Sequence, residues 1–468
     1  MSIRPYEFQR KGIQAARGLM RVAFYWEMGL GKTIVGSETM LSMKNSVNII
    51  ICQKSKVQDW VDHIRDNHRI YTVLDMTDKH KDMKRKVEMM LLNIKYKTNI
   101  PCVLVINYEL AFRRPELLEM EDFTLILDES QLIQNENAKR SKFILKMRPK
   151  NVILLSGTPT SGKYENLWSQ IRLLGWNISK QAYWNTYIET EWVEDSMGFR
   201  HEKVVGYINV DRLKKKLREH GAFFLKLEDA GISLPEQTDQ IIRVPQSKEY
   251  RHFMKHSVVE FDSKTNVVEL GPIKELWGKH VELVGDTILS KFLYARQLCG
   301  QYSEDKISAV KDIIESTEER IIIFYNFNAE KDILRHLALT NGRPVSEVSG
   351  DVRDLEAYES ENNSITLVQY QAGAMGLNLQ KAHFMIYFTL PFGKGSSAMW
   401  EQSKKRIHRI GQTQHCHYYY PMVEGSIEFW NLKMLKKGEE YNEELFRQDD
   451  SKYRSGSDAR TVSCSSVK

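Results

Sequence analysis

The chain has few of the features that mark secreted, membrane-spanning or metal-stabilised proteins. Its five cysteines are scattered and form no CxxC pair, which argues against a zinc site or a disulfide framework and fits a reducing cytosol. No apolar run approaches the roughly 20 residues that are needed to span a bilayer. The polar first residues resemble folded sequence rather than a secretory signal. No repeat of short period is present. We therefore expect a cytoplasmic protein without a membrane partner.

The composition is that of a globular protein with a mildly basic surface. The hydrophobic fraction of 42% and the charged fraction of 27% are ordinary for such proteins, and 468 residues suffice for two or three domains. The net charge of +6 is too small for this length to identify a partner. Local clusters say more, because lysine and arginine bind phosphates by charge, although each cluster alone is more often a solvated face. They are Lys79 to Lys86, Arg212 to Arg218 and Lys404 to Arg409.

Buried strands are predicted in two separate parts of the chain. Continuous rather than alternating hydrophobicity is typical of a parallel sheet that is covered on both faces. Such runs occur at Val47 to Cys52, Pro101 to Asn107, Phe123 to Glu129 and Asn151 to Thr158, and again at Arg320 to Asn326, Ile365 to Gln371 and His383 to Thr389. The pattern predicts an α/β fold with a first lobe over residues 1–175, a helical or irregular connector over 176–300, a second lobe over 301–446 and a disordered tail over 447–468.

The strongest single motif is EMGLGKT, Glu27 to Thr33, which follows an apolar run and precedes a helix-compatible segment. Backbone N–H groups can surround a phosphate only where glycine lets the loop approach closely. Lys32 would reach the β- and γ-phosphates, Thr33 would bind magnesium, and the helix N-terminus would add partial positive charge. Trp26 stands where a strict P-loop has its first glycine, and a plain glycine turn before a helix is the alternative reading. The phosphate-binding residues predicted here are Met28, Gly29, Leu30, Gly31, Lys32 and Thr33.

An acidic pair supplies the second half of such a site. Asp128 and Glu129 follow the apolar run Leu125 to Leu127, roughly a hundred residues after the P-loop. Asp128 would hold Mg²⁺ through its water shell, and Glu129 would orient and deprotonate the attacking water. Taken alone, an acidic pair after a strand usually begins a loop. Together with GKT it predicts a nucleotide hydrolase that uses ATP and Mg²⁺.

Further motifs in the same order resemble the SWI/SNF-type family of superfamily-two helicases, over nearly the whole chain up to about Gly438. The resemblance implies two RecA-like lobes and an adenine-reading glutamine, Gln9, in RPYEFQ. Gln53 replaces a family proline, and Gln131 replaces the histidine of the DEAH box. In the predicted connector, Phe224 to Asp229 (FLKLED), followed by Leu234-Pro235, resembles the segment that lies between the two lobes in the family. Lysine stands here where that segment has its first arginine. SGTP at Ser156 to Pro159 matches the family motif that links hydrolysis to the grip on nucleic acid.

The resemblance also implies the residues that contact the nucleic-acid backbone. Segments such as QKS followed by a tryptophan, and INYE, contact it in the family. The residues carried over on this basis are Lys54, Ser55, Trp60, Asn107, Tyr108, Thr158, Asn326 and Gln371.

The second lobe carries the most specific match, QSKKRIHRIGQ at Gln402 to Gln412, in which Lys405 replaces a family glycine. Arg406 and Arg409 are three residues apart, which places them on one face if the segment is helical. They would act as arginine fingers that stabilise the charge on the transferred phosphoryl group, with Gln402 in the same motif. AGAMGLNL, which contains Gly376 and Asn378, is a good match to the family's nucleotide-side motif.

Three functions remain open from the sequence. The first is a DNA-stimulated ATPase that remodels or displaces bound proteins; the family resemblance implies that it translocates on double-stranded DNA, without base specificity. The second is a strand-separating helicase on DNA or RNA. The third is a nucleotide-dependent clamp without productive turnover, supported only by the departures at Trp26, Gln53 and Gln131. The chain shows no bromodomain-like or histone-reading additions, so we expect a monomer that resembles stand-alone members from bacteria and their phages.

Overall fold

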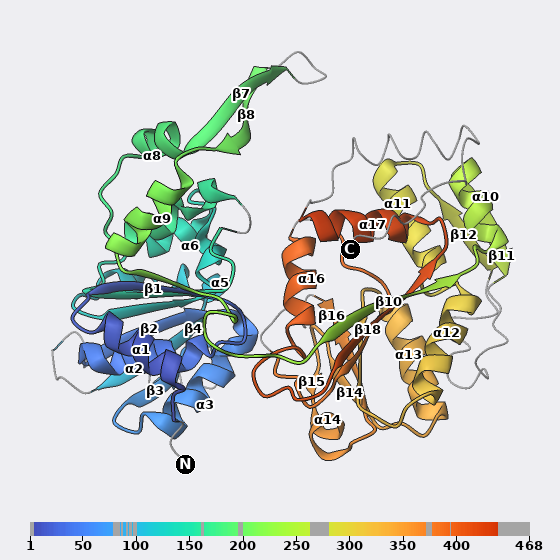
Figure 1. The fold of residues 1–468 in the computed structure, drawn as a ribbon, viewed down its shortest axis with the longest axis horizontal. Helices are drawn as coiled ribbons and strands as arrows, with labels where there is room; N and C mark the ends of the chain where they lie inside the picture. Colours follow the sequence, from blue (N-terminus) through green and yellow to red (C-terminus); the bar gives the residue numbers. More distant parts are fainter. Residues whose placement is uncertain are drawn as a thin grey trace. The chain divides into compact units, whose positions relative to one another are not determined.

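The computed structural model describes residues 4–77, 101–160, 163–194, 200–262, 280–370, 377–393 and 395–438, with residues 85, 88–89, 92 and 96 between the first two ranges. The chain divides into two compact units, Met1–Ser233 and Leu234–Lys468. Each unit is built on its own seven-stranded sheet (Figure 1). Within the described ranges, no helix combines the length and the apolar character that crossing a membrane requires.

The first unit has a fully parallel sheet in the order β3-β4-β2-β5-β6-β1-β9. Its inner strands are buried along almost their whole length, as the continuous apolar runs predicted. The strands are β1 (Arg21–Trp26), β2 (Val47–Cys52), β3 (Thr72–Asp75), β4 (Cys102–Asn107), β5 (Thr124–Asp128), β6 (Asn151–Ser156) and β9 (Ala222–Leu225).

Helices cover both faces of this sheet. Those on one side are α1 (Glu7–Ala16), α2 (Lys32–Met43) and α3 (Val57–Asn67), whereas α6 (Lys139–Ile144) and α9 (Val210–Glu219) lie on the other (Figure 1). The remaining helical segments are η1 (Lys54–Lys56), α5 (Tyr108–Ala111), η2 (Pro115–Leu118), η3 (Ser130–Ile133), η4 (Tyr164–Leu167), α7 (Trp168–Leu173) and α8 (Lys180–Tyr187).

The second unit has a sheet in the order β10-β18-β17-β13-β16-β14-β15, parallel except for the short β15. Its strands are β10 (Gln237–Val244), β13 (Ile321–Tyr325), β14 (Val345–Val348), β15 (Arg353–Asp354), β16 (Ile365–Gln369), β17 (Phe384–Tyr387) and β18 (Cys416–Val423). Its helices are α10 (Lys248–His256), α11 (Ile288–Cys299), α12 (Glu304–Glu315), α13 (Asn328–Thr340), α14 (Glu356–Ser360), α16 (Ser396–Lys404) and α17 (Ile427–Lys437). The predicted α/β fold with two RecA-like lobes is thereby confirmed.

The structure divides the predicted connector, residues 176–300, between the two units. The boundary falls after Ser233, because β9 extends the first sheet and β10 extends the second. Besides helices, this stretch contains two antiparallel hairpins, β7 (Ile188–Glu194) with β8 (Arg200–Tyr207) and β11 (Val258–Asp262) with β12 (His280–Val284). β9 is only four residues long and β10 is largely exposed. β10 therefore lacks the continuous apolar run that identifies a buried strand, and the apolar run of β9 is at the lower limit of length for a strand.

The predicted tail, residues 447–468, and most of the basic cluster from Lys79 to Lys86 lie outside the described residues.

Candidate functional site

The predicted motifs of the first unit converge on one edge of its sheet. In a parallel sheet all carboxyl ends lie at the same edge, and ligands bind there. Along this edge the strand order places Asn107 at the end of β4, Cys52 at the end of β2, Asp128 at the end of β5, Ser156 at the end of β6 and Trp26 at the end of β1. The P-loop, the acidic pair and the SGTP motif therefore follow adjacent strands, although they are far apart in the sequence.

The loop between β1 and α2 has the backbone of a phosphate cradle. Gly29 and Gly31 have φ values of 89° and 71°, a region that disfavours residues with a Cβ atom. A Cβ at Gly31 would lie 2.3 Å from Nε2 of Gln9, so this position accepts only glycine without rearrangement. α2 begins at Lys32 and has no acidic residue in its first turn. Its N-terminal N–H groups and its dipole therefore favour an anion.

Gln9 supports this loop from α1. Its side chain is 1% exposed, its Nε2 donates to the carbonyl of Leu30 at 3.0 Å, and its Oε1 accepts from the backbone N–H of Tyr6 at 2.9 Å. The family resemblance assigned Gln9 to adenine. In this structure its amide connects α1 to the P-loop, so its conformation and that of the loop depend on each other.

Trp26, the departure from a strict P-loop, has a packing role. Its side chain is 2% exposed and packs against Phe8 and Phe24, with ring centroids 5.9 and 5.2 Å apart. A Cβ at Gly12 of α1 would lie 2.5 Å from the Trp26 ring, so glycine at this position makes room for the indole. The Trp26 side chain therefore packs against α1 and β1, although a strict P-loop has glycine at this position.

Lys32 lies inside the loop. Its Nζ donates to the carbonyls of Trp26 and Glu27, at 3.0 and 3.3 Å. A Cβ at Gly157, in the SGTP motif, would lie 3.4 Å from the same Nζ. The amine is thus close to the end of β6 and surrounded by backbone, which is the setting in which a lysine binds phosphate as a point charge.

The acidic pair lies at the end of β5. Burial, and next the charge of Glu129, raise the pKa of Asp128, whereas the hydrogen bond from Trp60 and the charges of Lys56 and Lys32 oppose the rise. Glu129 has a φ of 54°, a left-handed conformation that is uncommon outside glycine and typical of functional positions. The backbone N–H of Glu129 donates to Oδ1 of Asp128 at 3.1 Å.

These residues fit a magnesium ion. Mg²⁺ prefers oxygen ligands and usually takes one or two from the protein, with water and substrate phosphates completing the set. The Asp128 carboxylate is buried and contacted by neutral N–H donors, so a cation would compensate its charge. Thr33 offers a second oxygen from the first turn of α2. The groups of three acidic, histidine or cysteine side chains that hold other metals do not occur among the described residues.

Gln131, which replaces the family histidine, connects the acidic pair to the SGTP motif. Its Nε2 donates to Oε2 of Glu129 at 2.8 Å, and its Oε1 accepts from the hydroxyl of Ser156 at 2.7 Å. The Ser156 hydroxyl in turn accepts from the backbone N–H of Thr158 at 3.1 Å. One neutral amide thus donates and accepts at once. A histidine can donate one hydrogen bond and accept another only when its ring is neutral and the proton is on the correct nitrogen.

Three of the predicted nucleic-acid contacts, Trp60, Tyr108 and Asn107, are buried within the first unit. Trp60 and Tyr108 are 1% and 0% exposed, and both point to Asp128, since Trp60 Nε1 donates to Asp128 Oδ2 and the Tyr108 hydroxyl donates to the Asp128 carbonyl, each at 2.9 Å. Asn107 is 2% exposed, and its Nδ2 donates to Glu109 at 2.7 Å. Buried side chains are not available to a backbone phosphate. Lys54 is exposed, and Ser55 and Thr158 are partly exposed, so these three remain candidate contacts.

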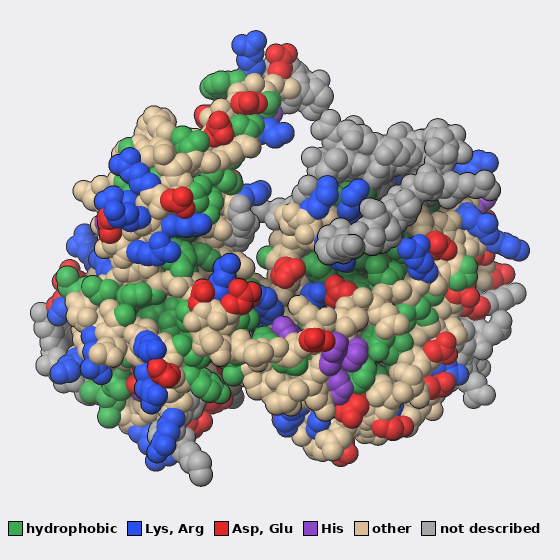
Figure 2. Space-filling model, viewed as in Figure 1, with side chains coloured by type: hydrophobic (Ala, Val, Ile, Leu, Met, Phe, Trp, Pro, Cys, Tyr) green, Lys and Arg blue, Asp and Glu red, His purple; other side chains and the backbone are tan. Residues whose placement is uncertain are grey.

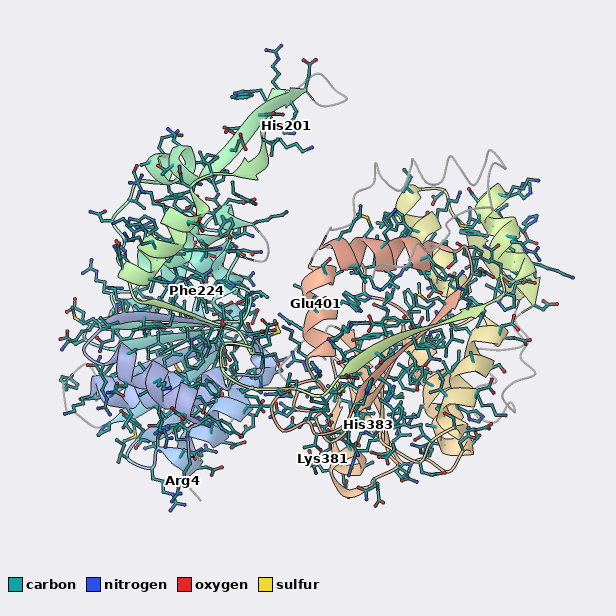
Figure 3. All side chains as sticks on the ribbon, viewed as in Figure 1. Arg4, His201, Phe224, Lys381, His383 and Glu401 are labelled. Atoms are coloured by element: carbon teal, nitrogen blue, oxygen red, sulfur yellow. The ribbon has the colours of Figure 1, made fainter. Side chains whose placement is uncertain are left out.

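The basic helix α9 is the second of the three basic clusters. Leu213 and Leu217 pack inward, and Lys and Arg side chains gather over this helix on the face shown in Figure 2. Arg218 lies over the ring of Phe224, which Figure 3 labels on β9, with 5.5 Å from its Cζ to the ring centroid. α9 is therefore an amphipathic cover of the sheet whose charges face outward.

In the second unit, the arginine segment is a loop and not a helix. α16 carries Glu401, labelled in Figure 3, and Gln402, and it ends at Lys404, so Arg406 and Arg409 lie in the turns that follow. Both arginines are partly exposed. Arg409 Nη1 donates to Oδ1 of Asn378, which brings two predicted nucleotide-side motifs together. Gly376 and Gln371 lie outside the described residues.

Two residues that we did not predict hold this loop. Gln412 is 8% exposed, and its Nε2 donates to the carbonyls of Gln380, Ala382 and Ile407 at 3.1, 2.8 and 3.3 Å. The His408 ring contacts the carbonyl of Pro235 at 2.8 Å. The only sequence signal for a structural role of Gln412 was a side-chain amide inside a polar, basic stretch. This signal could not identify its hydrogen-bond partners, because most of them are distant in the sequence.

Asn326, the remaining predicted nucleic-acid contact, is partly exposed at the end of β13. Its Nδ2 donates to the Thr389 hydroxyl and to the Leu390 carbonyl, both at 2.9 Å. The amide nitrogen is therefore used within the unit, and any contact with a phosphate would have to come from other atoms.

The chain matches two family domains and several known proteins. A model of the SNF2-related domain matches residues 23–303, and a model of the helicase conserved C-terminal domain matches residues 305–411. The putative ATP-dependent helicase/translocase YwqA of Bacillus subtilis is 24% identical over 91% of this chain and 46% of its own length. The ATP-dependent DNA helicase DDM1 of Arabidopsis thaliana is 23% identical over 87% and 57%.

Among solved structures, the SWI2/SNF2 ATPase core of Sulfolobus solfataricus in complex with dsDNA is 19% identical, with 97% of this chain and 96% of that chain covered and a TM-score of 0.40. The chain spans about half the length of the curated relatives it matches.

Proposed function

Because the chain belongs to the SNF2-related family, whose domain model matches residues 23–303, we propose that it is an ATP-hydrolysing motor that translocates on double-stranded DNA. The single observation that carries the proposal is the edge of the first sheet, where the glycine cradle and Lys32 follow β1 and the buried Asp128 ends β5, with only β6 between the two strands. A phosphate cradle, a magnesium carboxylate and a second carboxylate for water are together what phosphoryl transfer to water requires.

Each residue receives a role in this proposal. The loop from Met28 to Gly31 binds the phosphates through backbone N–H groups, and Lys32 contacts the β- and γ-phosphates. Thr33 and Asp128 hold Mg²⁺, which neutralises charge on the phosphates when it is bound. Glu129 orients and deprotonates the attacking water. Arg406 and Arg409, with Gln402, act from the second unit on the transition state, and Gln9, Gly376 and Asn378 complete nucleotide binding.

DNA as the track is supported by the names of the relatives rather than by charge, and the choice of the duplex follows from the family resemblance. Their names include a putative helicase/translocase and an ATP-dependent DNA helicase. The exposed Lys54 and the partly exposed Ser55 and Thr158 lie at the same sheet edge as the residues proposed to bind the nucleotide. A movement of this edge can therefore affect the binding of both DNA and nucleotide. Backbone contacts of this kind carry no base information. We therefore propose movement without sequence specificity, with displacement or remodelling of bound proteins as its result.

The stimulation of ATP turnover by different nucleic acids tests this function. Duplex DNA is expected to increase the ATPase rate, and single-stranded DNA and RNA much less. The stimulation should fade with rising salt, because phosphate contacts release counterions. Displacement of a third strand from a triplex, in the absence of unwinding, would identify translocation on the duplex. Unwinding of a forked substrate would instead favour a strand-separating helicase, and turnover that ignores every nucleic acid would contradict the motor.

The setting of the activity is also a proposal. Two of the relatives are named as ATP-dependent helicases of Bacillus subtilis, and we propose that the protein acts as a monomer in the cytoplasm of a bacterial or phage-infected cell. Light scattering with and without DNA measures the oligomeric state.

A further inference from the structure

Trp60 connects α3 to the carboxylate that is proposed to bind magnesium. Its side chain is 1% exposed, and its Nε1 donates to Oδ2 of Asp128 at 2.9 Å, whereas Oδ1 of the same carboxylate accepts from the backbone of Glu129 at 3.1 Å. One oxygen is thus held by the strand's own continuation and the other by a different element. The orientation of the carboxylate therefore depends on where α3 lies.

The indole is suited to this task by its chemistry. It is a donor only, it is neutral, and it does not titrate, so it stabilises the charged carboxylate without accepting its proton. Its large ring is fixed by packing, because Val57, Trp60, Val61 and Ile64 form one buried face of α3. A neighbour that orients a metal ligand in this way commonly affects metal affinity 10- to 100-fold.

α3 also begins directly after the segment that is proposed to contact DNA. The exposed Lys54 and the partly exposed Ser55 lie in η1, and α3 starts at Val57. An ion pair of 2.8 Å between Lys56 and Asp59 joins η1 to the first turn of α3. A phosphate bound at η1 therefore lies less than two turns before the indole, on a continuous stretch of helical backbone.

The middle of α3 is hydrogen-bonded to α2, the helix that follows the P-loop. Nε2 of His63, one turn after Trp60, contacts the hydroxyl of Ser37 in α2 at 2.8 Å, and the His63 and Trp60 rings are 6.0 Å apart. Burial lowers the pKa of His63 to about 4, so this ring is neutral at pH 7 and the contact is a neutral hydrogen bond. α3 thus touches both halves of the nucleotide site, through Ser37 on α2 and Asp128 on β5.

We propose that Trp60 is a positioning residue that orients Asp128 for magnesium and conveys occupancy of η1 by a nucleic-acid backbone to that carboxylate. The inference rests on the proposed function and extends it. It replaces the predicted contact of Trp60 with DNA by an indirect role, in which the segment around Lys54 binds the track and the indole transmits the event.

The test is Trp60→Phe, which keeps an aromatic ring and removes the Nε1–H group. Binding of a fluorescent ADP is measured by titration with Mg²⁺ and, separately, in EDTA. The variant is expected to need about 10- to 100-fold more Mg²⁺ for half-maximal binding, with unchanged affinity in EDTA. Its affinity for duplex DNA should equal that of the wild type, while the stimulation of ATP turnover by saturating duplex DNA should fall.

Trp168→Phe is the matched control. Trp168 is also a buried tryptophan of the first unit, 8% exposed, and it packs with Tyr183 at a centroid distance of 5.9 Å. Its substitution should leave the Mg²⁺ dependence unchanged at a similar loss of thermal stability. If both variants shift the Mg²⁺ dependence equally, or if neither does, Trp60 contributes only to packing of the hydrophobic core, and the inference is overturned.

A second variant covers the case in which Trp60→Phe does not fold. Incorporation of benzothienylalanine at position 60 replaces Nε1–H by sulfur at nearly constant ring size, so packing is kept and the donor is lost. The same Mg²⁺ shift is expected, and wild-type behaviour would overturn the inference. Failure of the proposed function looks different, because there the wild type itself would not bind magnesium nucleotide or would not respond to duplex DNA.

Discussion

Substitution of Arg406 or Arg409 by alanine is expected to lower DNA-stimulated ATP turnover by about 10³-fold or more while nucleotide affinity changes little. An arginine finger acts on charge that develops in the transition state, whereas the ground-state phosphates are proposed to be held by the first unit. Both side chains are partly exposed in a loop that Gln412 fixes by its own hydrogen bonds, so their removal should leave the fold intact. Single-turnover rates and binding of fluorescent ADP separate the two effects.

Lys405→Ala is the control for this pair, because it removes a cation from the same loop at the position where the family has glycine. It should retain near wild-type turnover. Arg406→Lys and Arg409→Lys should recover little, since an ammonium group lacks the planar fork of a guanidinium. Turnover that survives both alanine substitutions would contradict the assignment of these arginines, and equal losses in Lys405→Ala would indicate a general charge effect.

Glu129→Gln is expected to lower ATP turnover by about 10²- to 10⁴-fold while ATP and duplex DNA remain bound. The substitution removes the proposed base but keeps the size of the side chain. The amide oxygen of the new glutamine can still accept the hydrogen bond that Gln131 Nε2 donates to Glu129 at 2.8 Å. The network to Ser156 should therefore persist, and loss of rate can be attributed to the base. Product formation under single-turnover conditions is the measurement.

Glu121→Gln is the control, since Glu121 is an exposed glutamate of the same unit, with a 71% exposed side chain that pairs with Arg148 at 3.9 Å. It should turn over ATP like the wild type. Basal hydrolysis that persists in Glu129→Gln would exclude Glu129 as the base. A wild type that binds nucleotide and DNA but hydrolyses no more ATP than Glu129→Gln would favour the nucleotide-dependent clamp.

The sheets could be predicted where burial on both faces leaves a direct mark on the sequence. β2, β4, β5 and β6 are continuous apolar runs, and their residue ranges match the prediction closely. β10 could not be predicted in this way because most of its residues are exposed. β18 reads as CHYYYPMV, and two of its tyrosines form part of the core by stacking on Tyr387, which lies 4.9 Å from Tyr420 and 6.4 Å from Tyr418. Mixed aromatic strands of this kind carry a weak hydropathy signal.

The site could be predicted as far as motif order and parallel topology determine it. The P-loop and the acidic pair meet at one edge because their strands are parallel and close in the sheet. The direction in which individual side chains point was harder to predict from the sequence. For Trp60 a signal was present, since the spacing of Val57, Trp60, Val61 and Ile64 is that of a buried helix face. For Arg406, the loop that follows α16 is held by hydrogen bonds from Gln412 to carbonyls that are distant in the sequence, which no local pattern contains.

The central proposal is that both units take part in one hydrolysis reaction, and their separation during turnover tests it most directly. Cysteines introduced at Lys11 on α1 and Glu401 on α16 can carry a dye pair once Cys464 is replaced, because the four described cysteines are buried. We predict that an unreactive ATP analogue with Mg²⁺ and duplex DNA together narrow the distance distribution and shift it to one shorter state, and that Lys32→Ala abolishes the shift. A distribution that stays the same with either ligand, with both and with neither would contradict the account.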